Sequence, residues 1–267
     1  MCNGGGMVAD PFVRASRAVP NLRDLGERRT PDGLIPAGRF FRSGEPTGVG
    51  AGDDLRRLGI AWVVDLRTAG EAAQRPDRVP DGVVYQHLDV LADIPAEVAQ
   101  GQVQLMSDPV AFTAAFGHFD PVEQMHRTYA DLVTAPAALA GYADLLQAVL
   151  AADGAPLLVH CTVGKDRTGW AVTVLLLAAG VPHEVVRAEY MAVNPAVRDA
   201  FAGLVDQYLA AGAPRELLVP MLEVREEYLD TALACVEDVF GGFDGYLREG
   251  LGLAGSQVAA LRALLVR

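Results

Sequence analysis

Cysteine is scarce in this chain, and its positions exclude two classes of small protein. Of the 267 residues, three are cysteine: Cys2, Cys161 and Cys235. Residues spaced in this way build neither a disulfide framework nor a zinc cluster. The spacing therefore predicts a protein of a reducing compartment, and we expect a cytoplasmic location.

The sequence also lacks the segments that carry proteins into or across membranes. No run is both apolar enough and long enough to span a bilayer. The first ten residues have neither the charged nor the apolar region of a secretory signal. We therefore expect no integral membrane segment, while export by a route without a signal peptide stays open.

Positive charge is in short supply as well. The chain has 22 Lys and Arg against 34 Asp and Glu, which gives a net charge of −12. Nucleic acid and anionic membranes repel a protein of this charge, so we expect no nucleic-acid partner. Any phosphate-binding site must then be a local island of basic residues.

The chain does contain one loop that concentrates such groups. The string HCTVGKDRTG at residues 160–169 places Cys161 six positions before Arg167. An apolar run precedes it and a helical pattern over 170–179 follows, which predicts a strand, a tight loop and a helix N-terminus. Such a loop aims several backbone N–H groups at one point, and the helix dipole adds partial positive charge there.

The residue types in this loop suit the removal of a phosphoryl group. A positive field favours the thiolate of Cys161, which can attack phosphorus and form a thiophosphoryl-enzyme. The planar fork of Arg167 matches two phosphate oxygens. Thr168 is placed to hydrogen-bond the Cys161 sulfur, and it also suits a helix N-cap. The alternatives are an inert buried thiol and a surface ion pair, but the surrounding loop favours catalysis.

We expect no cofactor at this loop. His160 precedes the cysteine, and no further metal ligands are spaced around it. Its expected role is to orient the loop by bonding backbone groups.

Several motifs together carry a resemblance to a known family. Cys-x5-Arg followed by Thr-Gly resembles the signature of the cysteine-dependent tyrosine phosphatases. The full string is similar to that of the PtpB-like bacterial subgroup, which acts on proteins and phosphoinositides. Motifs along nearly the whole chain match this subgroup: 21–26, 41–45, 64–67, 188–190, 224–229 and 245–247.

The resemblance implies a phosphatase-type α/β fold and hydrolysis of phosphotyrosine. Phosphoserine, phosphothreonine and phosphoinositide monoesters are further implied substrates, and a phosphoinositide-preferring enzyme stays open as an alternative. Six charged residues recur in the matching motifs and are expected to pair beneath the pocket. They are Arg23, Asp24, Arg42, Glu45, Asp65 and Arg67.

The leaving oxygen needs a proton, and two carboxyl groups are candidates for the general acid. Asp166 lies inside the loop, where a carboxylate beside a bound dianion is unfavourable unless it is protonated. Phosphoinositide phosphatases of the myotubularin kind are similar at this position, which implies an acid there. The resemblance also places an aspartate facing the pocket at Asp93. We favour Asp166 over Asp93 and regard Asp89 as a weaker third; for each, the alternative is a solvated loop carboxylate.

The remaining loop residues are expected to bind the substrate phosphate. Thr162, Val163 and Gly164 supply backbone N–H groups, and Lys165 adds a second positive charge. We hypothesise that Lys165 admits anionic lipid headgroups, phosphoserine and phosphothreonine; the alternative is a solvent-facing lysine. At position 162, where some relatives have an aromatic or charged residue, this chain has a threonine. The resemblance therefore does not define the substrate preference at the edge of the pocket.

Hydrophobic periodicity predicts a single α/β domain over residues 11–267, after a mobile Gly-containing tail over 1–10. The expected strands are 40–42, 60–66, 83–88 and 156–160. The expected helices are 50–58, 68–73, 136–151 and nearly all of the chain from 170, with breaks near Pro182, Pro195, Pro214, Pro220 and 241–242.

We hypothesise that the helical insertion over 94–135, with Phe112, Phe116 and Phe119 facing inward, forms a lid over the active site. A helical pair packed on the sheet is an equal alternative.

Two other function classes fit less well. A silent phosphate-recognition module predicts the loss of the nucleophile, the clamp or the acid, and all three are present. Reduction of arsenate by a loop cysteine demands resolving cysteines, and neither Cys2 nor Cys235 is placed for that.

Overall fold

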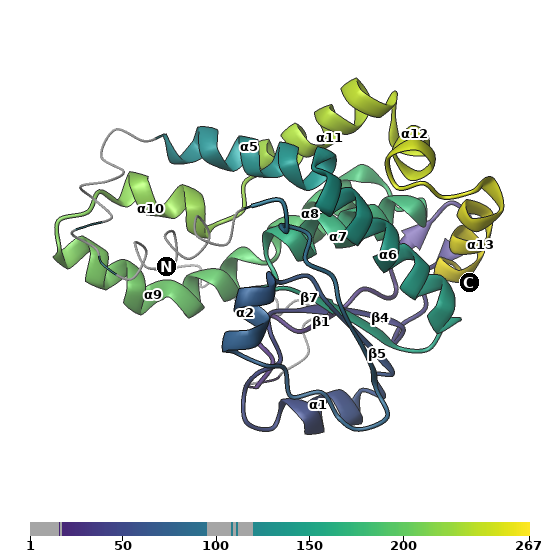
Figure 1. Cartoon of the computed structure of the whole chain (residues 1–267), viewed down its shortest axis with the longest axis horizontal. Coiled ribbons are helices and arrows are strands. Elements are labelled where there is room, and N and C mark those ends of the chain that lie inside the picture. The colour runs from purple at the N-terminus through teal and green to yellow at the C-terminus, as the bar shows by residue number, and fades with distance from the viewer. Residues whose placement is uncertain (1–15, 17, 95–107, 109–110, 112–119) are drawn as a thin grey trace, which may run out of the picture.

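The computed structural model describes Ser16, residues 18–94, Asp108, Ala111 and residues 120–267. At its centre is a five-stranded sheet in the order β1–β4–β7–β5–β6 (Figure 1). Strand β1 runs antiparallel to β4, and the other neighbours are parallel. The strands are β1 (Arg23–Asp24), β4 (Phe40–Ser43), β5 (Trp62–Asp65), β6 (Val84–His87) and β7 (Leu157–His160), and β2 (Arg29–Thr30) and β3 (Gly33–Leu34) form a separate hairpin.

Helices make up most of the rest, and the last third of the chain is almost entirely helical (Figure 1). This arrangement confirms the predicted α/β class with a helix-rich C-terminal third. The helices are α1 (Ala51–Arg57), α2 (Ala69–Gln74), α5 (Pro121–Thr134), α6 (Pro136–Ala152), α7 (Asp166–Ala178), α8 (His183–Met191), α9 (Asn194–Ala210), α10 (Arg215–Leu222), α11 (Glu226–Phe240), α12 (Phe243–Gly245), the π-helical turn η1 (Tyr246–Gly250) and α13 (Gly255–Leu265).

Alternating side chains of the strands hold a helical layer on each face of the sheet. Phe41, Val63 and Leu158 lie in one register and pack with buried residues of α1. Their neighbours Val64 and Val159 point the other way, into the larger core that contains α6 and α7. Because both faces are covered, these strands read in the sequence as continuous apolar runs.

The carboxyl ends of the parallel strands meet at one edge of the sheet. His160 is in register with Ser43 and Asp65, and Asp65 is in register with His87. The loops after all four strands therefore leave the same edge, where open α/β sheets usually bind ligands. The signature loop follows His160 directly.

The predicted strands and the helices expected from positions 50, 68 and 136 are confirmed. The helix after the loop begins at Asp166 rather than near 170, because its first turn already forms within the loop. The N-cap prediction for Thr168 is therefore wrong, since this residue lies inside α7. The predicted break near Pro220 is confirmed, but it lies at 223–225: Pro220 itself is inside α10, which ends at Leu222, and α11 begins at Glu226.

Some expectations fall on residues outside the described part of the chain. They are the mobile tail over 1–10 and most of the proposed lid over 94–135, including Phe112, Phe116 and Phe119. The final segment of that insertion is the ordered helix α5.

No single helix among the described residues is long and apolar enough to cross a membrane. Helices α5 and α6 pass that test when taken together, but they bend by 56° at the break between them. Nearly half of the residues in α6 are buried against the rest of the protein.

Gly164 gives a test of how tightly the loop is packed. Its φ is 72°, and a Cβ there would lie 2.3 Å from the Ser43 carbonyl oxygen, whereas Gly38 has a similar φ of 76° and open space around it. We expect Gly38→Ala to lower the free energy of unfolding by about 1 to 2 kcal/mol, the cost of the left-handed conformation. Gly164→Ala should cost clearly more, because the loop and β4 must separate. Urea unfolding measures both, and equal losses would contradict the close packing.

Candidate active site

The signature loop is held from outside by side chains that bind its carbonyl groups. Arg42 Nη2 donates to the Gly164 oxygen at 2.5 Å, and Asn21 Nδ2 donates to it at 3.1 Å. The backbone N–H of Glu45 donates to the Thr162 oxygen at 3.1 Å. The N–H and the carbonyl of a peptide point in opposite directions, so the N–H groups of Val163 and Lys165, which share peptides with these two carbonyls, point inward.

These inward N–H groups are available to a ligand. Within the described residues, the backbone N–H groups of 162–167 donate to no protein acceptor. Gly169 is the next residue whose N–H is bonded, to the Lys165 oxygen. Six donors at the N-terminus of a 13-residue helix suit a tetrahedral oxoanion.

Cys161 lies at the start of this loop and is 3 % exposed. Burial alone would lower the pKa of Arg167, but the charges of Cys161 and Glu71 outweigh burial and raise it above its ordinary value. Burial lowers the pKa of Arg42, and the charges of Glu189 and Cys161 offset part of that effect. Both guanidinium groups thus interact electrostatically with Cys161.

Glu71 is a residue of this site that the sequence analysis missed. Its two carboxylate oxygens accept from Arg167 Nη1 at 2.6 Å and Nη2 at 3.0 Å, and the Thr162 hydroxyl also donates to it. Burial raises the pKa of Glu71, but the hydrogen bonds and charge of Arg167 outweigh burial and hold it well below its ordinary value. The carboxylate therefore fixes the plane of the Arg167 fork.

A capping box fixes Glu71 in turn. The Thr68 hydroxyl accepts from the Glu71 N–H at 3.2 Å, and a Glu71 carboxylate oxygen accepts from the Thr68 N–H at 2.8 Å. Thr68 caps α2 as predicted. The Thr-x-x-Glu spacing was therefore a signal for the position of Glu71, although it reveals nothing about the contact with Arg167.

The three candidate acids lie in different environments. Asp166 Oδ1 accepts from the Tyr129 hydroxyl at 2.8 Å, and Oδ2 lies 3.3 Å from Lys165 Nζ. Asp93 is exposed and accepts from the N–H of Ala137 in the first turn of α6, at 2.7 Å. Asp89 accepts in the same way from the first residue of α2. Asp93 and Asp89 therefore stabilise helix N-termini, whereas Asp166 lies within the signature loop.

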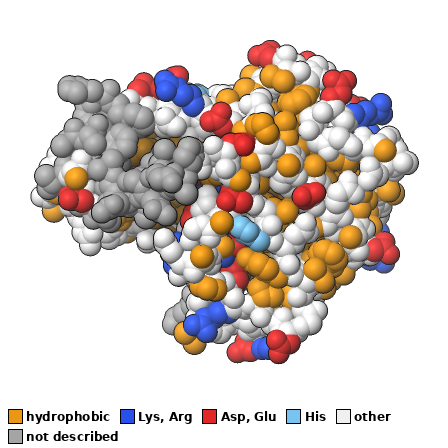
Figure 2. Space-filling model, in the orientation of Figure 1, with side chains coloured by type: hydrophobic (Ala, Val, Ile, Leu, Met, Phe, Trp, Pro, Cys, Tyr) orange, Lys and Arg blue, Asp and Glu red, His pale blue; other side chains and the backbone are white. Residues whose placement is uncertain are grey.

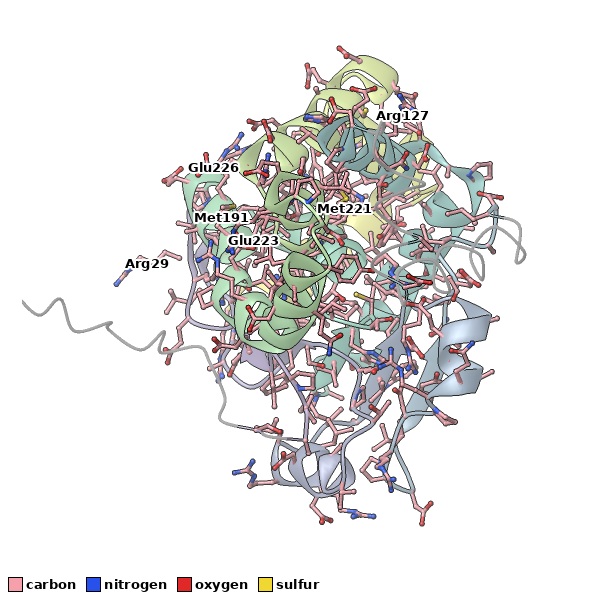
Figure 3. The ribbon with its side chains drawn as sticks, turned by 90° about the vertical axis from the view of Figure 1, so that its left-hand side faces the viewer. Arg29, Arg127, Met191, Met221, Glu223 and Glu226 are labelled. Carbon is pink, nitrogen blue, oxygen red and sulfur yellow. The ribbon has the colours of Figure 1, made fainter. Side chains whose placement is uncertain are left out.

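The side chain of Lys165 is 7 % exposed, so the solvent-facing alternative is wrong. Its Nζ donates to the Met221 carbonyl at 2.5 Å and lies beside Asp166. Met221 is near the end of α10, on the helical side of the molecule that Figure 3 shows. Helix α10 thus reaches the edge of the signature loop.

Thr168 and Val163 complete the loop residues predicted from the sequence. The Thr168 hydroxyl is buried and has no hydrogen-bond partner among the described residues. A buried hydroxyl without a partner costs about 1 to 3 kcal/mol, which a ligand or the Cys161 sulfur would recover. Val163 packs against the main core and so anchors the middle of the loop.

Two buried charge networks lie beneath the loop, and they confirm the expected pairing of the motif residues. In one, Glu189 of α8 binds three arginines: Arg23 and Arg42, each at 3.3 Å, and Arg28 at closer range. Asp24 accepts from the backbone N–H groups of Gly26 and Gly38.

The other network is centred on Arg67. Its guanidinium binds Asp65 at 2.7 Å, Asp77 at 2.8 Å and Glu45 at 3.0 Å. Burial raises the pKa of Asp65, but hydrogen bonds from Arg67 and the charge of His160 lower it to about 2.

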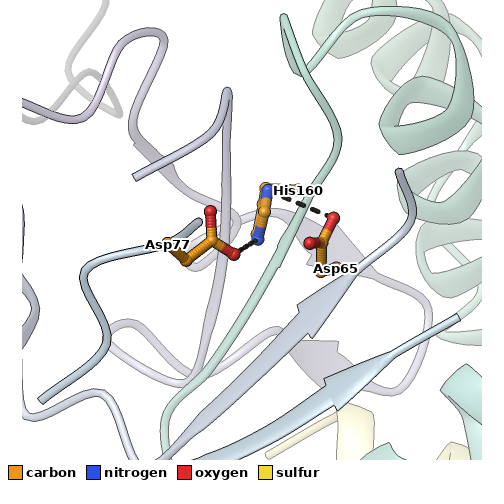
Figure 4. A group of neighbouring side chains, drawn as sticks. All are labelled: Asp65, Asp77 and His160. Atoms are coloured by element: carbon orange, nitrogen blue, oxygen red, sulfur yellow. Dashed lines mark ion pairs between the residues drawn. The ribbon is translucent and has the colours of Figure 1, made fainter. Parts of the chain in front are cut away.

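His160 joins this network to the loop (Figure 4). Its Nε2 lies 2.9 Å from Asp77, and its Nδ1 lies 3.2 Å from the Cys161 carbonyl oxygen. Asp65, Asp77 and His160 could each offer a ligand atom to a cation. The Arg67 guanidinium already pairs with both carboxylates, so its fixed positive charge opposes a metal there and favours the predicted orienting role of His160.

A model of the tyrosine phosphatase family matches residues 15–267. The chain belongs to this family. It is 30% identical to the triple specificity protein phosphatase PtpB of Mycobacterium tuberculosis, over 95% of this chain and 99% of that protein. It is 32% identical to the protein H16_A0669 of Cupriavidus necator, over 87% and 82% of the two chains. A tyrosine-protein phosphatase of Nostoc commune is 28% identical, over 86% and 75%.

The pair of Glu71 and Arg167 generates a prediction with a matched control. Glu71→Gln should lower kcat/KM for an aryl phosphate by at least about tenfold, because the Arg167 fork loses its orientation. Glu223→Gln is the control, because Glu223 also binds an arginine. Its partner is Arg198, and this pair lies at the surface, far from the signature loop in the sequence. That variant should retain activity.

The same pair predicts a pH dependence of stability. The depressed pKa of Glu71 stabilises the folded state above the ordinary carboxyl pKa of about 4.3, and this contribution is lost as pH falls below it. The difference in unfolding free energy between wild type and Glu71→Gln should therefore be present at pH 7 and shrink toward pH 3. A constant difference, or equal loss of activity in Glu223→Gln, would contradict the assignment.

Proposed function

We propose that this protein is a cysteine-dependent phosphatase that hydrolyses phosphotyrosine with Cys161 as nucleophile and Arg167 as phosphate clamp. One observation carries the proposal: Cys161 begins a loop with inward N–H groups, and two guanidinium groups act on its sulfur. Membership in the tyrosine phosphatase family supports it.

The chemistry follows from this arrangement. Phosphate oxygens bind the N–H groups of the loop from Thr162 to Lys165 and the N–H groups of Arg167 that Glu71 leaves free, which brings phosphorus to the Cys161 sulfur. The thiolate attacks, the phosphorus–oxygen bond to the leaving group breaks, and that oxygen takes a proton from Asp166. A water molecule then attacks the thiophosphate, gives its proton back to Asp166 and releases the Cys161 thiolate. The Thr168 hydroxyl assists by bonding the sulfur as it leaves.

We further propose a substrate range that includes phosphoserine, phosphothreonine and phosphoinositide monoesters. The relative from M. tuberculosis is named a triple specificity protein phosphatase. Lys165 supports the extension, because it adds a second positive charge to the loop that contains Arg167. On the face shown in Figure 2, the visible Lys and Arg side chains are scattered among acidic ones.

The nucleophile is tested by Cys161→Ser. This variant should lose turnover of para-nitrophenyl phosphate and still bind vanadate, because the loop N–H groups and Arg167 remain. Cys235→Ser, which changes a thiol in α11, is the matched control and should retain full activity. Turnover by Cys161→Ser, measured with chelator present, would overturn the proposal.

The role of Lys165 is tested by a substrate panel. Lys165→Ala should lower kcat/KM for a phosphoinositide about tenfold more than for a phosphotyrosine peptide, since a charged hydrogen bond is worth about 1.5 to 3 kcal/mol. Lys165→Arg should retain part of the preference because it keeps the charge. Equal phosphoinositide turnover by wild type and Lys165→Ala would reject the hypothesis while leaving the phosphotyrosine activity standing.

A further inference from the structure

A chain of hydroxyl groups from two other helices ends on the carboxylate of Asp166. The Tyr190 hydroxyl of α8 lies 2.7 Å from the Tyr129 hydroxyl of α5, which lies 2.8 Å from Asp166 Oδ1. Both tyrosines are at least 99 % buried.

The direction of this chain is set by its end. An ionised carboxylate only accepts hydrogen bonds, so Tyr129 must donate to Asp166, and its oxygen then accepts from Tyr190. Burial, followed by the charge of Asp166, raises the pKa of both tyrosines well above the ordinary value. They therefore remain protonated donors across the working pH range.

Packing holds the chain rigidly. The Tyr129 ring meets the Tyr190 ring edge-on, with centroids 6.1 Å apart, and lies against Tyr228 of α11 at 5.6 Å. The Tyr228 hydroxyl donates to the Pro220 carbonyl and takes no part in the chain. Phenylalanine would serve this packing equally well, so the hydroxyl groups of Tyr129 and Tyr190 require another explanation.

We propose that Tyr129, oriented by Tyr190, is a positioning residue for the general acid. This inference rests on the proposed role of Asp166. Because the Tyr129 hydroxyl donates to Oδ1 and Lys165 Nζ lies 3.3 Å from Oδ2, the two contacts hold the carboxyl plane in one orientation. The chain thus selects one rotamer of a side chain that is 25 % exposed.

Two contacts hold the Asp166 carboxyl group. The Tyr129 hydroxyl donates to Oδ1, and Lys165 Nζ lies 3.3 Å from Oδ2. Other tyrosines that interact with its charge are Tyr142 of α6, Tyr190 of α8 and Tyr228 of α11. Removing the Tyr129 hydroxyl should therefore loosen the carboxyl group and slow proton transfer to the leaving group.

The experiment compares Tyr129→Phe, Tyr190→Phe and the control Tyr228→Phe, which removes a hydroxyl from the same aromatic cluster. Phenyl phosphate, whose leaving group needs a proton, is compared with 2,4-dinitrophenyl phosphate, whose leaving group does not. Tyr129→Phe should lower kcat about tenfold for phenyl phosphate and less than about twofold for the activated ester.

Tyr190→Phe should show the same pattern more weakly, and Tyr228→Phe should treat both esters as wild type does. Equal losses on both esters in Tyr129→Phe would overturn the positioning role.

Asp166→Asn and Asp93→Asn separate this inference from the assignment on which it rests. If Asp166→Asn treats both esters as wild type does and Asp93→Asn loses activity on phenyl phosphate alone, the acid is Asp93 and the proposed function is wrong on that point. If Asp166→Asn loses activity on phenyl phosphate alone while Tyr129→Phe does not, the tyrosine chain alone is refuted.

Discussion

The shape of the signature loop depends on Arg42, which connects a buried carboxylate to a loop carbonyl. One end of its guanidinium pairs with Glu189 and the other donates to Gly164. A guanidinium taken out of water costs several kcal/mol unless charge and hydrogen bonds compensate it. Glu189 supplies that compensation from α8, so a helix far along the chain fixes the backbone that will hold phosphate.

The same networks explain how a chain of net charge −12 can bind an anion. Three arginines surround Glu189, and Arg167 faces the loop while paired with Glu71. The positive groups are concentrated under one edge of the sheet, where the helix N-terminus of α7 adds to their field.

Proton transfer makes a second demand on the same region. With Asp166 as the proposed general acid, its carboxyl group must reach the leaving group while Tyr129 and Lys165 contact its two oxygens. In that proposed role the hydroxyl of Tyr129 matters for geometry, because it holds the carboxyl plane in one orientation.

The sequence predicted the strands β4 to β7, the helices α1, α2 and α6 and the loop from Cys161 to Arg167, because these follow from local periodicity and from spacing within ten residues; the two-residue strands β1, β2 and β3 carry no such pattern. Apolar runs predicted β5 and β7, and the Thr68 cap predicted α2. It also predicted that the motif arginines would pair, although not that Glu189 would bind three of them. Tertiary structure alone decided the contacts between distant segments: Glu71 with Arg167 across 96 positions, and Tyr129 with Asp166 across 37. Such contacts depend on strand register and helix packing, which bring together residues whose separation in the chain carries no periodic signal.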